Sequence, residues 1–147
     1  MIRTLVLVVL LVLHQGDASA QQPPFSTPAD IRKFTDAVMG MVGAGKYEDA
    51  WKRMRPASII PSAEFDAFAA QFNSQLPNFA PRYGKPSGFE YLRDQQLGTS
   101  LLRFQYIAKY ERSATRWIFI FYRTGSGWVL TDFKFDGNIS ALFPGEA

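Results

Sequence analysis

Apolar side chains recur every three to four residues in the first half of the chain and at every second residue in the second half. The first spacing is typical of helices that bury one face, and the second is typical of strands. The helical spacing predicts three helices, over residues 28–43, 47–55 and 62–77. The alternating spacing predicts four strands, over residues 89–96, 101–110, 115–124 and 128–136. Helices followed by a strand meander predict an α+β domain, in which three N-terminal helices pack on a curved four-stranded antiparallel sheet.

Individual residues set the ends of these helices. Thr27 is the expected N-cap of the first helix, Pro28 its first residue and Asp30 the partner in a capping box. Pro77 is expected to end the third helix, because proline lacks the backbone N–H that continues a helix. The residues that follow, 78–87, are rich in Pro and Gly and are predicted to form a loop.

Strand alternation divides the predicted sheet into two faces, of which one is rich in aromatic residues. A four-residue turn over 111–114 would place Tyr106 opposite Phe119. A three-residue hairpin loop before Trp128 would place Phe119 opposite Phe133. A loop of the other parity would turn the whole fourth strand over, so this assignment depends on the loop length. We expect the aromatic face to lie under the helices.

The aromatic face is also the candidate binding site of the domain. With one helix residue it predicts a cavity for a small apolar ligand, lined by Trp51, Phe104, Tyr106, Trp117, Phe119, Phe121 and Phe133. Tyr106 is the strongest candidate, because its hydroxyl could donate a hydrogen bond to a ligand from apolar surroundings. Large aromatic side chains also fill protein cores, so a closed core is the alternative.

The opposite face of the sheet mixes charges with more apolar residues than a solvated face needs. Its apolar residues are Ile107, Ile118, Ile120, Tyr122, Trp128 and Leu130. Large exposed apolar patches usually mark interfaces, so we expect a homodimer that packs sheet against sheet. The alternative is that the C-terminal residues cover this face, or that a monomer tolerates it.

Two carboxylates on the strands are candidates for acid–base chemistry. Asp132 or Asp94 could act as a catalytic base with Tyr106 as hydrogen-bond donor, if the carboxylate lay in the aromatic pocket with a raised pKa. Alternation instead places Asp132 on the outer face beside Lys134 and Arg103, where it would be an ordinary surface charge. The direction of Asp132 therefore separates an enzyme from a binding domain.

The N-terminus has the layout of a secretory signal peptide over residues 1–20. It has a basic start, an apolar run over 4–13 and an Ala-x-Ala site that ends at Ala20. Cleavage there would leave an extended leader over 21–27 and a single domain over 28–143. We expect a protein secreted to the bacterial periplasm, without a stable membrane anchor after cleavage.

The composition excludes several kinds of site. The chain has no cysteine, and its one histidine, His14, lies in the expected signal peptide. The mature chain would therefore have neither thiol nor imidazole, which excludes disulfides, Cys or Ser-His-Asp nucleophiles and zinc sites built on His or Cys. We expect neither metal nor cofactor. The formal net charge of +3 is too small to predict a nucleic-acid-binding surface.

A resemblance to a known fold is carried by the run GKYEDAW over 45–51, a short third helix, and a sheet with Arg116-Trp117, Phe121-Tyr122-Arg123 and Gly127-Trp128. These features resemble the cystatin-like α+β superfold. More narrowly, they resemble its nuclear-transport-factor-like, or ketosteroid-isomerase-like, group and the small secreted bacterial members of that group. The resemblance covers about residues 28–143. It implies a cone of helices and curved sheet whose mouth holds a small apolar ligand.

Proteins of this group include cofactor-free enzymes with a carboxylate base and Tyr or Asp donors, immunity proteins and plain binding modules, so function must come from the site. The sequence favours a secreted, non-catalytic binding or interaction domain with an aromatic cavity and a dimerising sheet. The alternatives are a cofactor-free enzyme of the proton-transfer or hydrolytic kind, and a structural or immunity-type partner of another protein.

Overall fold

The structure is a computed structural model that describes residues 25–143 of the 147-residue chain. The helices come first: α1 (Pro28–Gly43), α2 (Tyr47–Met54), a short 3₁₀ turn η1 (Arg55–Ala57) and α3 (Ser62–Tyr83). The strands follow: β1 (Pro86–Leu97), β2 (Leu101–Tyr110), β3 (Ala114–Arg123) and β4 (Trp128–Asp136), before a last 3₁₀ turn η2 (Ser140–Leu142). The expected signal peptide and the first residues of the leader lie outside the described residues.

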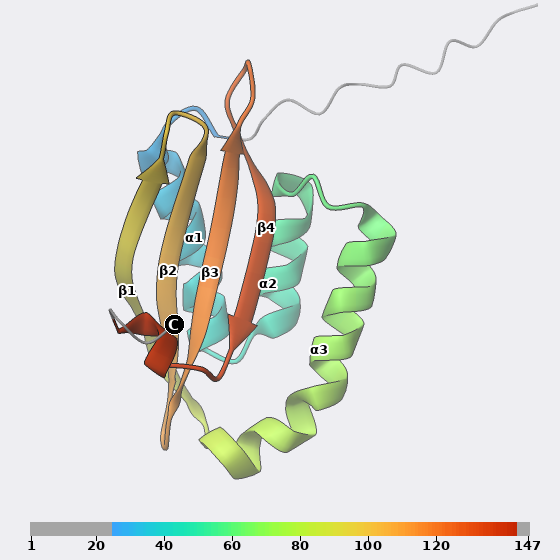
Figure 1. Cartoon of the computed structure of the whole chain (residues 1–147). Helices are drawn as coiled ribbons and strands as arrows, with labels where there is room; N and C mark the ends of the chain where they lie inside the picture. The colour runs from blue at the N-terminus through green and yellow to red at the C-terminus, as the bar shows by residue number, and fades with distance from the viewer. Residues whose placement is uncertain (1–24, 144–147) are drawn as a thin grey trace, which may run out of the picture.

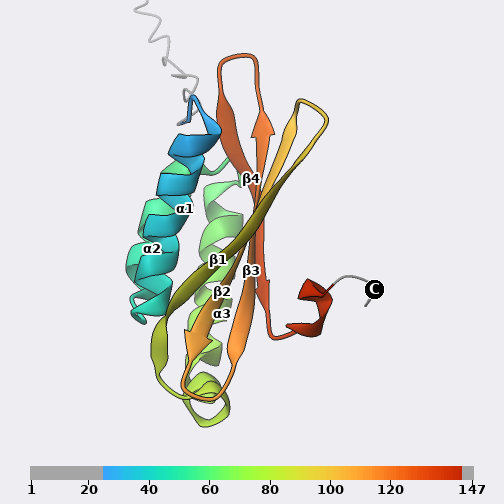
Figure 2. The same ribbon diagram turned by 90° about the vertical axis from the view of Figure 1, so that its left-hand side faces the viewer.

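The four strands form one open antiparallel sheet in the order β1-β2-β3-β4, and the three helices pack against one of its faces (Figure 1). The predicted α+β class is therefore confirmed. Figure 2 shows the sheet edge-on, with the helices on one side and η2 on the other. The hydrophobic core lies between the helices and the sheet. None of the helices described in residues 25–143 is long and apolar enough to cross a membrane.

The start of α1 forms as the sequence predicts. The backbone N–H of Asp30 donates to Thr27 Oγ1, and the backbone N–H of Thr27 donates to the Asp30 carboxylate, both at 3.2 Å. This capping box satisfies two donors that have no partner inside the helix. Ile31, Phe34 and Val38 then form a buried face, and α1 packs on β1 and β2.

The prediction that Pro77 ends the third helix is wrong, because α3 continues to Tyr83 with Pro77 and Pro81 inside it. Each proline removes one backbone hydrogen bond, and the helix bends in its last turns (Figure 1). Aromatic packing offsets this loss. Phe79 packs on Tyr83 with ring centroids 5.2 Å apart, and Tyr83 packs on Tyr110 of β2 at 5.5 Å. Most of the predicted loop is therefore helix.

The turn between β2 and β3 is shorter than predicted. The backbone N–H of Tyr110 donates to the carbonyl of Ser113 at 2.9 Å, so the turn holds two residues in place of four. Tyr106 consequently lies opposite Trp117 and not opposite Phe119. Because the register differs by two residues, Tyr106 and Trp117 keep their predicted face under the helices.

The loop between β3 and β4 differs by one residue from its predicted length. The first residues of β4 therefore turn the opposite side chains toward the core from those that the sequence predicts. Arg123 pairs with Trp128, and the backbone N–H of Thr124 donates to the carbonyl of Gly127 at 2.7 Å, so the loop holds two residues in place of three. Trp128 and Leu130 consequently lie in the core, with exposures of 3% and 0%. The prediction that these two residues belong to the outer face is therefore wrong. Val129, paired with an outward residue of β3, faces outward in their place.

A β-bulge at Thr131 restores the predicted faces for the rest of β4. Phe121 pairs with Leu130, whereas its neighbour Ile120 pairs with Asp132, so one extra residue of β4 is accommodated between them. From Asp132 onwards the strand follows the register that the sequence predicts.

The two edges of the sheet are protected differently. At the start of β4, the backbone N–H of Trp128 donates to the carbonyl of Phe25 at 2.8 Å, and Ile59 N–H donates to the carbonyl of Leu130 at 3.0 Å. The opposite edge is β1, whose pairing with β2 contains two register shifts. Bulges of this kind interrupt the regular ladder that another strand would need for pairing.

Candidate functional site

The residues predicted to line an aromatic pocket lie together in the hydrophobic core. These seven residues are at most 7% exposed: Trp51, Phe104, Tyr106, Trp117, Phe119, Phe121 and Phe133. Trp51 and Trp117 have ring centroids 5.9 Å apart, as do Tyr106 and Phe119, so their rings fill the space between the helices and the sheet.

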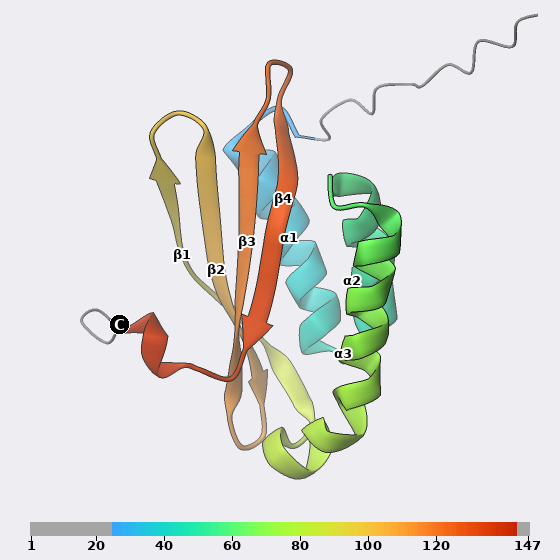
Figure 3. The ribbon, with the colours of Figure 1, turned by 45° about the vertical axis from the view of Figure 1, so that its right-hand side comes forward.

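A cleft of about 530 Å³ opens beside this core, and its lining residues come from α3 and the adjoining ends of β3 and β4. Figure 3 shows α3 in front of the helix-covered face of the sheet, beside β4. Its lining on α3 consists of Phe68, Gln71, Phe72, Gln75, Asn78, Phe79, Arg82 and Tyr83. Its lining on the sheet side consists of Thr115, Phe135, Asp136 and Gly137. We call this site the α3–β4 cleft. Its volume lies in the range of small-molecule binding sites.

Aromatic rings form the floor of the α3–β4 cleft. Phe72 of α3 packs edge-on against Phe135 of β4, with ring centroids 4.8 Å apart. Trp117 stacks on Phe135 at 5.1 Å, and Trp51 packs on Phe72 at 5.0 Å. Two of the predicted pocket residues thus support the floor without lining the cleft. The buried indole N–H of Trp51 has no hydrogen-bond partner within residues 25–143, so an unpaired donor lies next to a floor ring.

Polar side chains of α3 form the rim of the cleft. Gln71, Gln75, Asn78 and Arg82 recur at intervals of three or four residues, so they share one face of the helix. In the described part of the chain, the side-chain amides of Gln75 and Asn78 have no hydrogen-bond partner. The guanidinium of Arg82 lies 5.2 Å from the ring centroid of Tyr83. The rim therefore offers amide donors and acceptors and one cation.

An ion pair on the outer face of the sheet holds the side chain of Asp136, a residue at the edge of the cleft. Arg116 Nε and Nη2 donate to the two carboxylate oxygens of Asp136 at 3.1 and 2.6 Å, and the backbone N–H of Asn138 donates to the same carboxylate at 2.9 Å. Burial by itself raises the pKa of Asp136, but the hydrogen bonds from Arg116 and Asn138 outweigh burial and hold the pKa below its ordinary value. The Asp136 carboxylate is therefore charged and already paired.

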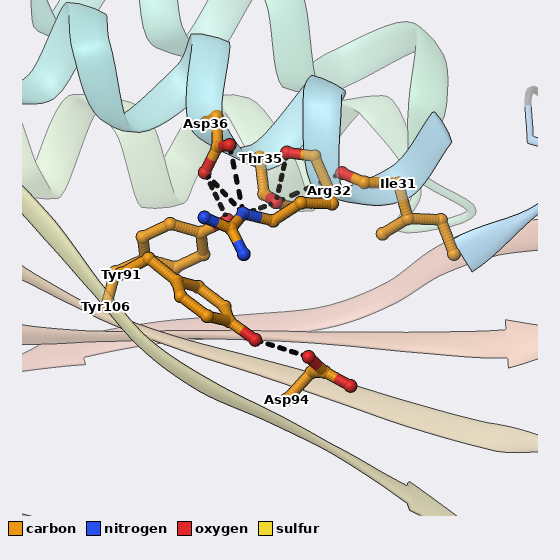
Figure 4. Close-up of polar contacts among 7 residues, drawn as sticks. All are labelled: Ile31, Arg32, Thr35, Asp36, Tyr91, Asp94 and Tyr106. Atoms are coloured by element: carbon orange, nitrogen blue, oxygen red, sulfur yellow. Dashed lines mark hydrogen bonds and ion pairs between the residues drawn. The ribbon is translucent and has the colours of Figure 1, made fainter. Parts of the chain in front are cut away.

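A second polar cluster lies between α1 and the strands β1 and β2 (Figure 4). The hydroxyl of Tyr106 lies 2.7 Å from Thr35 Oγ1 and donates to Asp36 Oδ1 at 2.8 Å. Arg32 Nε donates to both carboxylate oxygens of Asp36, at 2.8 and 2.9 Å, and its guanidinium lies 3.4 Å from the Tyr91 ring centroid. Burial raises the pKa of Tyr106 well above its ordinary value. Tyr106 is therefore a neutral donor engaged inside the protein.

The two carboxylates that the sequence offers as catalytic bases do not meet Tyr106. Asp132 is exposed on the outer face of the sheet, where it pairs across the strands with Ile120. Asp94 is exposed on β1 and accepts a hydrogen bond from the Tyr91 hydroxyl. The structure therefore does not assemble the predicted pair of a strand carboxylate and Tyr106.

Asp36 is the carboxylate that contacts Tyr106, and sequence reasoning missed it. The signal that could have found it is Arg32, four residues earlier, because opposite charges at this spacing face each other on a helix. The two side chains are 38% and 37% exposed, so the pair lies at the edge of the buried cluster. Residues 25–143 contain no group of three or more His, Cys, Asp or Glu side chains that could hold a metal ion.

Comparison with known protein families, with curated proteins and with solved structures gives no match in any of the three. The class that the fold defines is an α+β domain with three helices on one face of an open antiparallel sheet. The α3–β4 cleft is the feature of this domain from which a function can be inferred.

Proposed function

We propose that the protein is a secreted, non-catalytic binding domain that holds a small ring-containing ligand in the α3–β4 cleft. The observation that carries the proposal is the combination of an open aromatic floor with a rim of unpaired side-chain amides. Apolar floors with a few polar groups are typical of small-molecule sites, and about 530 Å³ is sufficient for such a ligand.

The chemistry of the cleft favours a ligand with one flat apolar face and a polar edge. The rings of Phe72, Phe79 and Phe135 offer stacking or edge-on contacts to that face. The amides of Gln75 and Asn78 both donate and accept hydrogen bonds, so they fit hydroxyl or carbonyl groups at the polar edge. Arg82 adds attraction for an anionic group.

The charged groups of the cleft favour binding over acid–base catalysis. A general base needs a proton-accepting group that can reach the substrate. The carboxylate of Asp136 is held by Arg116, and Arg82 lies over the ring of Tyr83. These contacts leave no free carboxylate among the lining residues to accept a proton, which supports a binding role.

We further propose that the domain is cone-shaped and cystatin-like and belongs to the nuclear-transport-factor-like group. The support for this proposal is the order of three helices and a four-stranded meander, with a cleft beside the third helix. Superposition of an experimental structure on members of that group tests it, and a different strand order in those members would contradict it.

Two naphthalene probes, 2-naphthol and naphthalene-2-carboxylate, test the cleft because they share a ring system and differ in charge. We expect both to shift the side-chain amide signal of Asn78 in ¹H–¹⁵N NMR spectra at probe concentrations up to about 1 mM. The carboxylate should bind more tightly than the neutral probe, because Arg82 is at the rim.

Two tryptophan variants of α3 provide the matched comparison. Gln75→Trp fills the cleft and should abolish the shifts at Asn78. Ala70→Trp adds the same side chain at an exposed position of the same helix outside the lining, and it should leave the shifts unchanged. No shift with either probe, or undiminished binding by Gln75→Trp, would count against the proposal.

A further inference from the structure

The outer face of the sheet, opposite the helices, carries exposed apolar side chains at the end where β1 turns into β2 and β3 turns into β4. Leu97, Leu101 and Tyr122 are 55%, 38% and 46% exposed. They are paired directly across the strands in one row that ends with Val129 of β4, which is only 6% exposed. This row is apolar on all four strands, which a solvated sheet face does not require.

The next row on the same face carries opposite charges on either side of an isoleucine. Arg103 of β2, Ile120 of β3 and Asp132 of β4 are paired directly across the strands. Arg103 donates to Gln95 of β1, and in the described part of the chain the Asp132 carboxylate has no hydrogen bond or ion pair. A positive and a negative side chain therefore lie one strand to either side of β3.

We propose that two copies of the chain associate face to face about a two-fold axis that runs parallel to β3. This axis places β2 of each copy over the partner's β4, so that Arg103 meets the partner's Asp132 and Asp132 meets the partner's Arg103. In the same rows, Ile120 meets the partner's Ile120 and Tyr122 meets the partner's Tyr122. Facing sheets pack about 10 Å apart, a distance that these side chains span together.

The charges select this axis over the alternative. A two-fold axis perpendicular to the strands through the same row would set Arg103 against the partner's Arg103 and Asp132 against the partner's Asp132, and like charges oppose association. The turn η2 lies over β1 and β2, where Arg93 donates to the carbonyl of Leu142, and the segment that leads to it crosses the far end of β3, so the end of β3 that carries Ile120 and Tyr122 stays free (Figure 1). The α3–β4 cleft lies on the helix side, so the dimer is independent of the proposed function.

Charge-reversal variants test the pairing of Arg103 with the partner's Asp132. A mixture of the two variants serves as the control for folding. Arg103→Glu faces the unchanged Asp132, and Asp132→Arg faces the unchanged Arg103, so each variant alone sets like charges together at both symmetric contacts. We expect each reversal to raise the Kd of the dimer at least about a hundredfold in sedimentation equilibrium. An equimolar mixture restores both opposite-charge pairs in a heterodimer, whose Kd we expect to lie within about tenfold of the wild-type value.

Native mass spectrometry identifies the mixed dimer, because the two variants differ in mass. A dimer in the mixture, with each variant alone monomeric, supports the proposal. A mixture that stays monomeric, or single variants that dimerise as the wild type does, overturns it. The wild-type protein decides the point by itself if either variant fails to fold, since a monomer at the highest soluble concentration also overturns the proposal.

Discussion

The hydroxyl of Tyr106 is fully buried and is bonded to Thr35 and Asp36. A neutral hydroxyl can serve both contacts, whereas a phenolate would place a second negative charge beside Asp36 in a poorly solvated site. Burial raises the pKa of Tyr106 for this reason, and burial also raises the pKa of Tyr47, whose hydroxyl lies 3.2 Å from that of Tyr110. Both tyrosines therefore remain neutral in the folded protein.

We expect Tyr106→Phe to lower the free energy of unfolding by about 1–3 kcal/mol at neutral pH, because it removes the buried hydrogen bonds to Thr35 and Asp36. Equilibrium unfolding in urea measures the change. Tyr122→Phe, measured at a protein concentration below the Kd of the proposed dimer, is the matched control, since the Tyr122 side chain is exposed and its hydroxyl has no hydrogen bond within residues 25–143. This control should change the free energy of unfolding by less than about 0.5 kcal/mol.

Tyr106→Phe should also change how the free energy of unfolding depends on pH in alkaline solution. In the unfolded chain, tyrosines lose their protons near their ordinary pKa of 10.0, whereas the folded-state pKa values of Tyr106 and Tyr47 are raised. Above about pH 10 the unfolded state therefore binds fewer protons, and the free energy of unfolding falls by about 1.4 kcal/mol per pH unit for each tyrosine. Tyr106→Phe should remove one tyrosine's share of this slope. An unchanged slope would contradict the role given to burial.

At the scale of the elements, the bulge at Thr131 reconciles two conflicting demands on β4. The two-residue loop before the strand turns Trp128 inward, and the pairing with β3 turns Phe133 inward. Regular alternation would send residues separated by an odd number of positions to opposite faces. One extra residue lets both side chains enter the core.

We expect the deletion of Thr131 to be tolerated, because it would leave Leu130 opposite Phe121 and Asp132 opposite Ile120 in a continuous ladder. The free energy of unfolding should change by less than about 1 kcal/mol, measured by thermal unfolding with circular dichroism. Deletion of Ile118 from the uninterrupted β3 is the control. It would turn half of that strand inside out, so the cooperative transition should be lost. Loss of the fold in the Thr131 deletion would show that the bulge does more than restore the register.

Local signals predicted the elements better than the pairing between them. The capping box at Thr27 depends on residues within one helical turn, so it could be read from the sequence. The bulge in β4 depends on a conflict between a loop and a neighbouring strand, which no short window contains. The last turns of α3 were missed because the proline rule outweighed the apolar spacing that continues through Phe72, Leu76, Phe79 and Tyr83. The sequence prediction therefore also missed the part of the cleft floor and rim that these last turns of α3 form.

At the scale of the whole molecule, the sheet separates two surfaces with different chemistry. The helix side carries the α3–β4 cleft, with its aromatic floor and amide rim. The outer side carries the apolar row of Tyr122 and the charged row of Arg103 and Asp132. Ligand binding and self-association are therefore expected to be separable by mutation.

The proposed secretion also concerns the whole chain. We expect the full sequence, expressed in a bacterium, to be recovered from the periplasm with Gln21 as its first residue, because the Ala-x-Ala site ends at Ala20. Intact-mass spectrometry measures the mature mass. Ala20→Arg should block processing because the site requires a small residue, whereas Ala20→Ser should not. Recovery of the unprocessed chain from the cytoplasm would contradict this expectation.

The bond between Phe25 and Trp128 joins the first described residue to the last strand. Closing so long a loop is entropically unfavourable until the strands between its ends are in place. The backbone of Phe25 can therefore cover the edge of β4 only after Trp128 has been synthesised. The growing chain cannot complete its fold before that point. If the chain is exported as we expect, the edge of β4 therefore stays open to other strands until the residues up to Trp128 have been made.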